Sequence, residues 1–376
     1  MKIRTFLIFF VLCLAFVFPN NVMAIDKKEL PKELSPALSY LISISDDQSS
    51  KGFDPAKVSQ IIDFILKDKK KQIYFSKLIK KRSSAYSDYT IETDLKTFIG
   101  YLFNPDIPSA FAAPISIRLS WWKPLNKSFN LVDLSSRFDS LTEPVIVKGT
   151  EHTETTPDDS TGGYYNYDLK NSCFLFKYKD RKVLISLNKQ IKKSTVGYKG
   201  YPFGPKKEPY NIYSDDDGLT TFGLGWVSSY VYDSLSISVY ISDGKSIKCG
   251  AFNWMNAGWA GNNMAKKKHV YNGIHKYGNA LRTILENKSL PSSETLKKSL
   301  KKLDEIPKIR LLELAKNFHT KAEKKFSNFP DDEYEDDVKL DKFSREQLAA
   351  IIFTEYIRIM LGKETVFTKK DIPFMF

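Results

Sequence analysis

Residues 226–241, WVSSYVYDSLSISVYI, decide the fold class of this chain. From Leu235 to Ile241 an aliphatic residue alternates with serine or tyrosine, so one face of an extended strand is apolar and the other is polar. Residues 226–232 are rich in aromatic and β-branched residues, which strands favour. We expect two strands, Trp226–Tyr232 and Leu235–Ile241, that form a hairpin with its turn at Asp233–Ser234. One face of this hairpin should belong to the core.

The same two-residue period extends outward from this stretch over residues 111–260. Apolar and polar residues alternate over Ile115–Leu119, and Val145–Val147 is a short apolar run. Phe174–Tyr178 and Val183–Leu187 flank a turn-like Lys179–Arg181. Several short strands with turns between them predict an antiparallel sheet for this region.

The region before the sheet, residues 25–110, has a helical pattern. Phe53-Asp54-Pro55 is a helix start, because aspartate caps a helix and proline is tolerated at its first position. Apolar residues then recur at helical spacing through residues 58–66, and Ile73, Leu78 and Ile79 extend the pattern. We therefore expect one long helix or two shorter ones in this region.

Helical patterns return after the sheet, in residues 261–376. Apolar stripes run over 270–285, 296–303 and 309–326, and Ser344 with Gln347 forms a capping box before a final apolar helix. Gly273 and Gly278 lie beside the first stripe, where we expect close packing of another backbone. The predicted fold class is α+β, with a central antiparallel β-sheet packed against N-terminal and C-terminal helices in one or two closely packed units.

The first 24 residues resemble a signal peptide. Lys2 and Arg4 precede the apolar run 6–18, and residues 22–24 offer a cleavage site with small residues. We expect a mature chain that begins near Ile25 and is periplasmic or secreted. No later apolar run reaches the length of a membrane span, so we expect a soluble protein without stable membrane insertion.

The charge of the chain is positive, with a formal net charge of +13 over 376 residues. Only nine of the 57 basic residues are arginine, whose bidentate geometry favours base and phosphate recognition, so we expect no nucleic acid partner. The lysine excess is typical of an AT-rich genome. Outside the cytoplasm it would also attract an anionic envelope surface.

The two cysteines of the mature chain, Cys173 and Cys249, both lie in segments with strand patterns. In an oxidising compartment we expect a disulfide between them. The alternative is that both thiols are free and buried as small hydrophobic groups.

No linear motif of catalysis, of cofactor binding or of a metal site stands out, so we expect no cofactor and no metal. The chain has four histidines, and no two of them are three to five residues apart. Whether the protein is an enzyme stays open. A periplasmic hydrolase without a recognisable motif is the alternative to a binding protein.

The candidate ligand site is an aromatic platform formed by the loop-like segment 194–213 and the tryptophans that follow it. Flat aromatic rings cover the apolar faces of sugars or lipid headgroups, and neighbouring polar groups supply hydrogen bonds. The alternative is that these rings form a small core between the sheet and the helix after Trp259. The candidate residues are Tyr198, Lys199, Tyr201, Trp226, Trp254, Trp259, Asn262 and His269.

These patterns favour a non-enzymatic binding or envelope-interaction protein. Its expected ligand is a cell-wall glycan, an anionic envelope polymer or another envelope protein. A structural partner subunit is a third possibility, which a contiguous exposed apolar patch on the terminal helices would support.

Overall fold

The structure is a computed structural model, and it describes residues 27–46, 52–67, 73–123, 131–158, 162–221, 225–330 and 340–376. The expected signal peptide, residues 1–24, lies outside the described residues.

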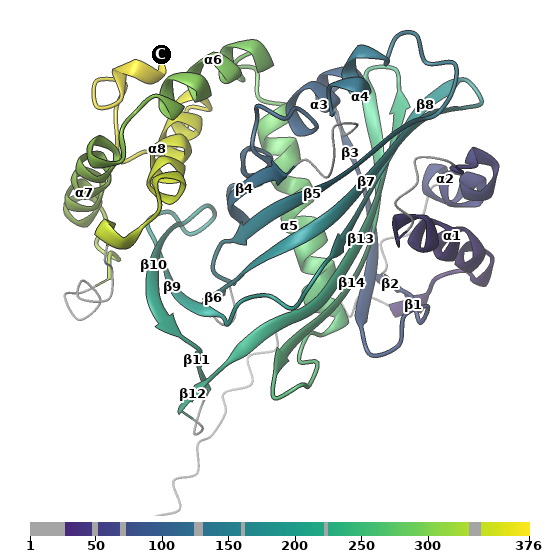
Figure 1. The fold of residues 1–376 in the computed structure, drawn as a ribbon, viewed down its shortest axis with the longest axis horizontal. Helices are drawn as coiled ribbons and strands as arrows, with labels where there is room; N and C mark the ends of the chain where they lie inside the picture. The colour runs from purple at the N-terminus through teal and green to yellow at the C-terminus, as the bar shows by residue number, and fades with distance from the viewer. Residues whose placement is uncertain are drawn as a thin grey trace, which may run out of the picture.

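A nine-stranded sheet forms the centre of the molecule (Figure 1). Only β1 and β2 pair in parallel, and the other neighbouring strands are antiparallel, which confirms the predicted antiparallel sheet. The strands in spatial order are β1 (Lys27–Glu29), β2 (Ile73–Phe75), β3 (Ser83–Ile91), β14 (Ser246–Trp259), β13 (Ser229–Asp243), β8 (Arg181–Gln190), β7 (Asn166–Tyr178), β5 (Val145–Thr155) and β4 (Ile117–Lys123).

Two smaller sheets lie at the lower left of the main sheet in Figure 1. The first has the order β10 (Tyr210–Asp217), β9 (Tyr198–Phe203) and β6 (Gly163–Tyr164), and the second pairs β11 (Leu219–Thr221) with β12 (Gly225–Val227).

Helices surround the sheet and come from both ends of the chain, so the predicted α+β class is confirmed. In Figure 1, α1 and α2 lie on the right, α5 runs behind the sheet, and α6, α7 and α8 lie on the left. The described α-helices are α1 (Ser35–Asp46), α2 (Ser59–Leu66), α3 (Leu95–Leu102), α4 (Val132–Ser136), α5 (Lys267–Leu285), α6 (Ser293–Asp304), α7 (Lys308–Lys325) and α8 (Arg345–Met360).

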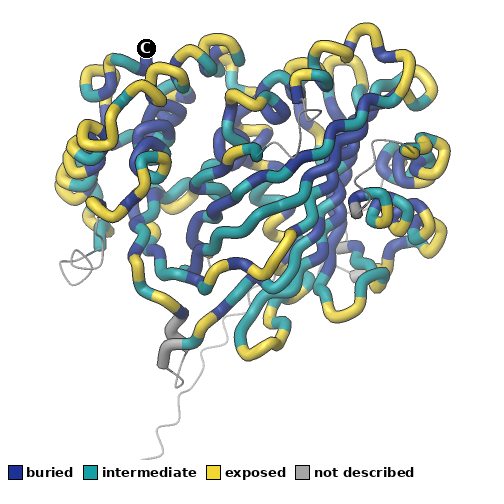
Figure 2. Tube along the Cα trace, viewed as in Figure 1, coloured by how far each residue is buried: buried dark blue, intermediate teal, exposed yellow. Residues whose placement is uncertain are grey.

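The two faces of the sheet support separate cores, and a smaller apolar cluster lies beneath α5. On one face the aliphatic and aromatic side chains of β7, β8, β13 and β14 pack against α1 and α2. On the other face a larger core joins the sheet to α3, α4 and the C-terminal helices. In Figure 2 the strands beside α1 and α2 are coloured mainly as buried, whereas those across the middle of the sheet are mainly of intermediate exposure.

The hairpin predicted at Asp233–Ser234 is wrong. β13 continues through these residues as one strand, and its register against β14 shifts between Val231 and Asp233. An extra residue in a strand changes which face each side chain takes, so a β-bulge imitates the interrupted alternation of a turn. The real turn follows Asp243, where Gly244 has a φ of +72°. The predicted hairpin around Lys179–Arg181 is confirmed as β7–β8.

The helical prediction for residues 25–110 holds only in part. The start at Asp54 is confirmed, because its side chain accepts a hydrogen bond from the Ala56 N–H at 2.9 Å, ahead of a 3₁₀ turn (Pro55–Val58) and α2. Ile73 is not helical but begins β2, and β3 follows in the same region. β3 pairs with β14, so a partner distant in the sequence determines its structure.

The C-terminal helices agree with the predicted stripes. The capping box at Ser344 and Gln347 is present at the start of α8. A methyl group on Gly278 would meet the Tyr89 ring at 3.0 Å, so the packing there is close, but the neighbour is a side chain and not the predicted backbone. A methyl group on Gly273 would meet no atom within 4 Å outside its own helix backbone, so the expectation is wrong for that residue.

The predicted disulfide is also wrong, because Cys173 and Cys249 are both free and buried. Cys173 lies on β7 and Cys249 on β14, with β8 and β13 between them. Three strand spacings amount to about 14 Å, whereas a disulfide requires Cα atoms within about 7 Å. Burial raises the pKa of the Cys173 thiol to about 12 and also raises that of Cys249. Both therefore remain protonated and unreactive.

Among the described residues, no helix has both the length and the apolar character that crossing a membrane requires.

Candidate functional site

A cavity of about 610 Å³ lies between the edge strand β4 and the helices α6 and α8. The segment that contains the 3₁₀ turn Ser109–Phe111 borders it from one side, and the N–H of Ala110 donates to Ser120 Oγ at 3.0 Å. Cavities of 300–1,000 Å³ are typical of small-molecule sites.

The walls of this cavity, which we call the β4 cavity, combine apolar and charged side chains. Aromatic and aliphatic groups come from β4, α6 and α8, and lysines from α6 stand opposite β4. The apolar lining residues are Pro105, Pro108, Ala110, Leu119, Trp121, Trp122, Leu300, Leu303, Ala349, Ala350 and Phe353, the basic ones are Arg118, Lys297, Lys298, Lys301 and Arg345, and the others are Asp106, Ser120, Glu294, Asp304 and Glu346.

Arg118 is the most deeply buried charge in this lining, since its side chain is only 4% exposed. Its guanidinium lies over the Tyr213 ring at 3.8 Å and over the Phe343 ring at 4.8 Å. Its Nη1 is 3.5 Å from Glu154 Oε2, and its Nη2 has no hydrogen-bond partner among the described residues. This nitrogen is itself buried, so the guanidinium contributes its positive charge to this side of the cavity rather than an exposed donor.

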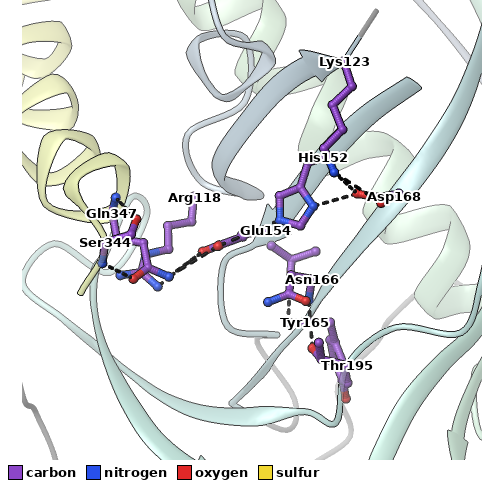
Figure 3. A network of polar contacts seen from close by, with 11 residues as sticks. Arg118, Lys123, His152, Glu154, Tyr165, Asn166, Asp168, Thr195, Ser344 and Gln347 are labelled. Atoms are coloured by element: carbon purple, nitrogen blue, oxygen red, sulfur yellow. Dashed lines mark hydrogen bonds and ion pairs between the residues drawn. The ribbon is translucent and has the colours of Figure 1, made fainter. Parts of the chain in front are cut away.

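Glu154 connects Arg118 to the first turn of α8 (Figure 3). The amide of Gln347 donates to both oxygens of Glu154 at 3.3 Å, and Gln347 is itself fixed by the Ser344 capping box. The ion pair of Glu154 with Arg118 is a single long contact. The α8 cap therefore positions the counter-charge of Arg118.

A second part of the network lies on the same sheet face, on β4, β5 and β7 (Figure 3). His152 Nδ1 lies 2.7 Å from Asp168 Oδ1, and Lys123 Nζ lies 3.1 Å from the same oxygen. The Trp121 ring stacks on His152 with centroids 4.2 Å apart, and Trp121 is 37% exposed. This arrangement holds an indole at the rim of the β4 cavity in a fixed orientation.

Behind the cavity, on the opposite face of β5, lies a buried carboxyl group. Glu151 pairs with Trp122 in the strand register and accepts a hydrogen bond from Asn171 Nδ2 at 2.8 Å. Burial raises the pKa of Glu151, and hydrogen bonds from Ser109 and Asn171 oppose that shift. The carboxyl group is therefore easier to protonate than an exposed glutamate.

The residues predicted for the aromatic platform are not brought together at the β4 cavity. None of the eight is among the described residues that line it. Tyr198, Lys199 and Tyr201 lie on β9, whereas Trp226 lies on β12.

Trp254 cannot form part of an exposed platform in this conformation. It is only 1% exposed and packs in the core beneath α1 and α2, on the face of the sheet opposite α5. Trp259 ends β14, and Asn262 follows it in an exposed turn, where its side chain donates to the Ala260 carbonyl. The alternative of a core against α5 is therefore also wrong for Trp254.

His269 has a local structural role. It is exposed at the start of α5, and its Nδ1 accepts a hydrogen bond from the Lys266 N–H at 3.4 Å. Among the described residues, no group of three or more His, Cys, Asp or Glu is arranged to hold a metal ion.

Sequence reasoning missed the β4 cavity although a signal was present. The consecutive pair Trp121-Trp122 lies three residues after Arg118, one of only nine arginines. Neither alternation nor a motif relates this segment to α6 and α8, which lie far along the chain. A scarce arginine beside two tryptophans was the available clue.

Comparisons with known proteins add little. No protein-family model matches the chain, and no curated protein sequence matches it. The crystal structure of human STARD10 is similar over 65% of this chain and 85% of that chain, with 10% sequence identity and a TM-score of 0.27. A likeness of that size carries no argument about function.

Proposed function

We propose that this chain is a binding protein that holds a small amphipathic ligand in the β4 cavity. One observation carries the proposal: the cavity of about 610 Å³ joins an apolar wall to a basic one, to which Arg118 and the exposed Lys298 and Lys301 contribute. Apolar walls with a few fixed polar groups are typical of ligand sites.

The charge around the cavity favours a ligand with an anionic or acceptor-rich group. Lys298 and Lys301 are exposed on α6 and line the cavity opposite β4. Lys297 is already paired with Asp106 at 3.0 Å, and Arg345 donates to carbonyl groups at the end of α6, so these two have internal roles. Arg118, Lys298 and Lys301 would thus attract the ligand, and salt would weaken this attraction.

We also propose that the protein acts outside the cytoplasm, in the periplasm or as a secreted protein. The support is residues 1–24, with their basic start, apolar run and small residues before Ile25. A cell-wall glycan, an anionic envelope polymer or an envelope protein would be available there. Mass spectrometry of the N-terminus of exported protein tests this point. A chain that retains residues 1–24 contradicts it.

The binding proposal is tested with two probes of equal chain length, decanoate and decanol, in a titration followed by tryptophan fluorescence. Trp121 and Trp122 line the cavity and report its occupation. We expect decanoate to bind and decanol to bind more weakly. The double variant Lys298→Glu/Lys301→Glu should bind decanoate severalfold more weakly and bind decanol as the wild type does.

A matched pair of α8 variants locates the binding. Ala350 lines the cavity, and Thr354, one turn further along α8, does not. Ala350→Phe should abolish binding of both probes, whereas Thr354→Phe should bind like the wild type. Equal binding by the two variants would place the probes elsewhere and refute the proposal for this cavity.

A further inference from the structure

β4 has one side without a strand partner. It stands at the end of the nine-stranded sheet and pairs with β5, and the order of strands places no other described strand beyond it (Figure 1). Among the described residues, no backbone hydrogen bond joins Leu119, Ser120 or Trp121 to a segment outside the sheet. Such an edge offers N–H and C=O groups to another extended chain.

The β4 cavity meets the strand along this edge. Consecutive side chains of a strand point to opposite faces, so a cavity over one face would touch every second residue. This cavity touches five consecutive residues, Arg118 to Trp122. It therefore surrounds the rim of the sheet, where the backbone groups that do not pair with β5 point outward.

The surroundings of the edge match the two faces of an added strand. Trp121 and His152 stack on one face of the sheet, while Ser120 and Trp122 belong to the other. Phe353 and Leu300 border the cavity from α8 and α6. Side chains of an added strand would point alternately to the face with Trp121 and His152 and to the face with Trp122.

We infer that the ligand of the β4 cavity is an extended peptide with an acidic group, which adds to β4 as a tenth strand of the sheet. This inference rests on the proposed binding function. Five residues of β4 span about 16 Å, which is enough for four or five peptide residues. The acidic group of the peptide lies beside the exposed Lys298 and Lys301, which line the cavity from α6.

A peptide satisfies this site better than a hydrocarbon does. Backbone donors and acceptors recur along a strand edge with a spacing of about 7 Å, and a peptide backbone repeats its own groups at the same spacing. A hydrocarbon chain would exclude water from the β4 edge and leave these groups without partners. A bound amphiphile is therefore the competing outcome of the test.

The experiment uses the mature chain and a pool of randomised, N-acetylated hexapeptides. Peptides retained by the wild type and by Thr354→Phe, but not by Ala350→Phe, are identified by mass spectrometry and synthesised singly. We expect retained sequences to contain aspartate or glutamate. Replacement of that acid by its amide should weaken binding at least tenfold.

Two measurements distinguish strand addition from other peptide binding. Methylation of the peptide nitrogens at alternate positions should abolish binding in one of the two registers and have little effect in the other, because only every second N–H faces β4. Hydrogen exchange should slow at one or more amides of residues 119–121 when the peptide binds.

The outcomes separate this inference from the proposed function. If decanoate binds in a manner blocked by Ala350→Phe and no peptide is retained, the site binds amphiphiles and the peptide inference is wrong. If a retained peptide tolerates methylation in both registers, strand addition is wrong. If neither probe class depends on Ala350, the proposed function itself fails.

Discussion

The face of the central sheet beneath α1 and α2 and the β4 end of the sheet are covered in different ways. Beneath α1 and α2 the sheet contributes a closed core of aliphatic and aromatic side chains, in which Phe252 and Trp254 are each 1% exposed. At the β4 end, α6 and α8 leave a cavity and enclose a buried arginine with an incomplete set of partners. A closed core stabilises the fold, whereas an incomplete one retains room and unused hydrogen-bonding capacity for another molecule.

The largest expected effect concerns the closed core beneath α1 and α2. Phe252→Ala should lower the free energy of unfolding by about 3–5 kcal/mol, because it leaves a void in a dry core. Leu300→Ala, in the wall of the β4 cavity, should lower it by only about 1 kcal/mol because that side chain already borders empty space. Urea unfolding of both variants measures the difference. Equal losses of unfolding free energy in the two variants would contradict the distinction between the closed core and the β4 cavity.

A double-mutant cycle on Arg118 and Glu154 measures how much their buried ion pair, at the β4 end of the sheet, contributes to stability. Arg118→Leu should lower the free energy of unfolding by about 3 kcal/mol, since it leaves Glu154 buried without its counter-charge. Glu154→Leu in the same chain should restore more than half of that loss, because neither charge then remains buried. A double variant as unstable as the single one would show that the stacking of Arg118 on Tyr213 matters more than its charge.

The pH dependence of Glu151 gives a smaller effect. Its folded-state pKa is raised by burial, so the folded state holds this proton at pH values where the unfolded state has released it. The contribution of Glu151 to stability therefore falls as the pH rises from about 4.3, the usual glutamate pKa, through the raised value. Glu151→Gln should lose this dependence, and its melting temperature relative to wild type should rise between pH 4 and pH 8. A constant difference would contradict the assignment.

The smallest effects concern α5, which packs against β3 and β14. Gly273→Ala should stabilise the protein by up to about 1 kcal/mol because its position is open and helical. Gly278→Ala should destabilise it by about 1–2 kcal/mol because the new methyl group meets Tyr89. Thermal unfolding of the pair measures both signs. A stabilising Gly278→Ala would mean that the Tyr89 ring moves aside without cost.

Local pattern was sufficient for much of the fold but not for the strand pairings. The capping signals of Asp54 and Ser344 depend on neighbours within three residues, and both were predictable. β3 has a weak pattern of its own and exists because Met255 to Ile247 of β14 lie beside it. The bulge before Asp233 was mistaken for a turn because both interrupt alternation.

The candidate site was less predictable than the fold, because distant segments build it. Arg118 comes from β4, its counter-charge from β5 and the capping residues from α8. The sequence instead favoured the aromatic-rich segment 194–213 and the tryptophans after it as the ligand site, but composition does not show which of these rings are buried in the core. Trp254 and Phe252 lie on the same face of β14, and that face belongs to the core beneath α1 and α2.

The pairing of β3 with β14 also determines when this protein folds. Ile91 pairs with Ile247, and the helices α1 and α2 close over Phe252 and Trp254, so the first part of the chain has no stable partner until the ribosome has passed these residues. Contacts so distant in sequence form slowly. The core beneath α1 and α2 can therefore be completed only after β14 has been synthesised.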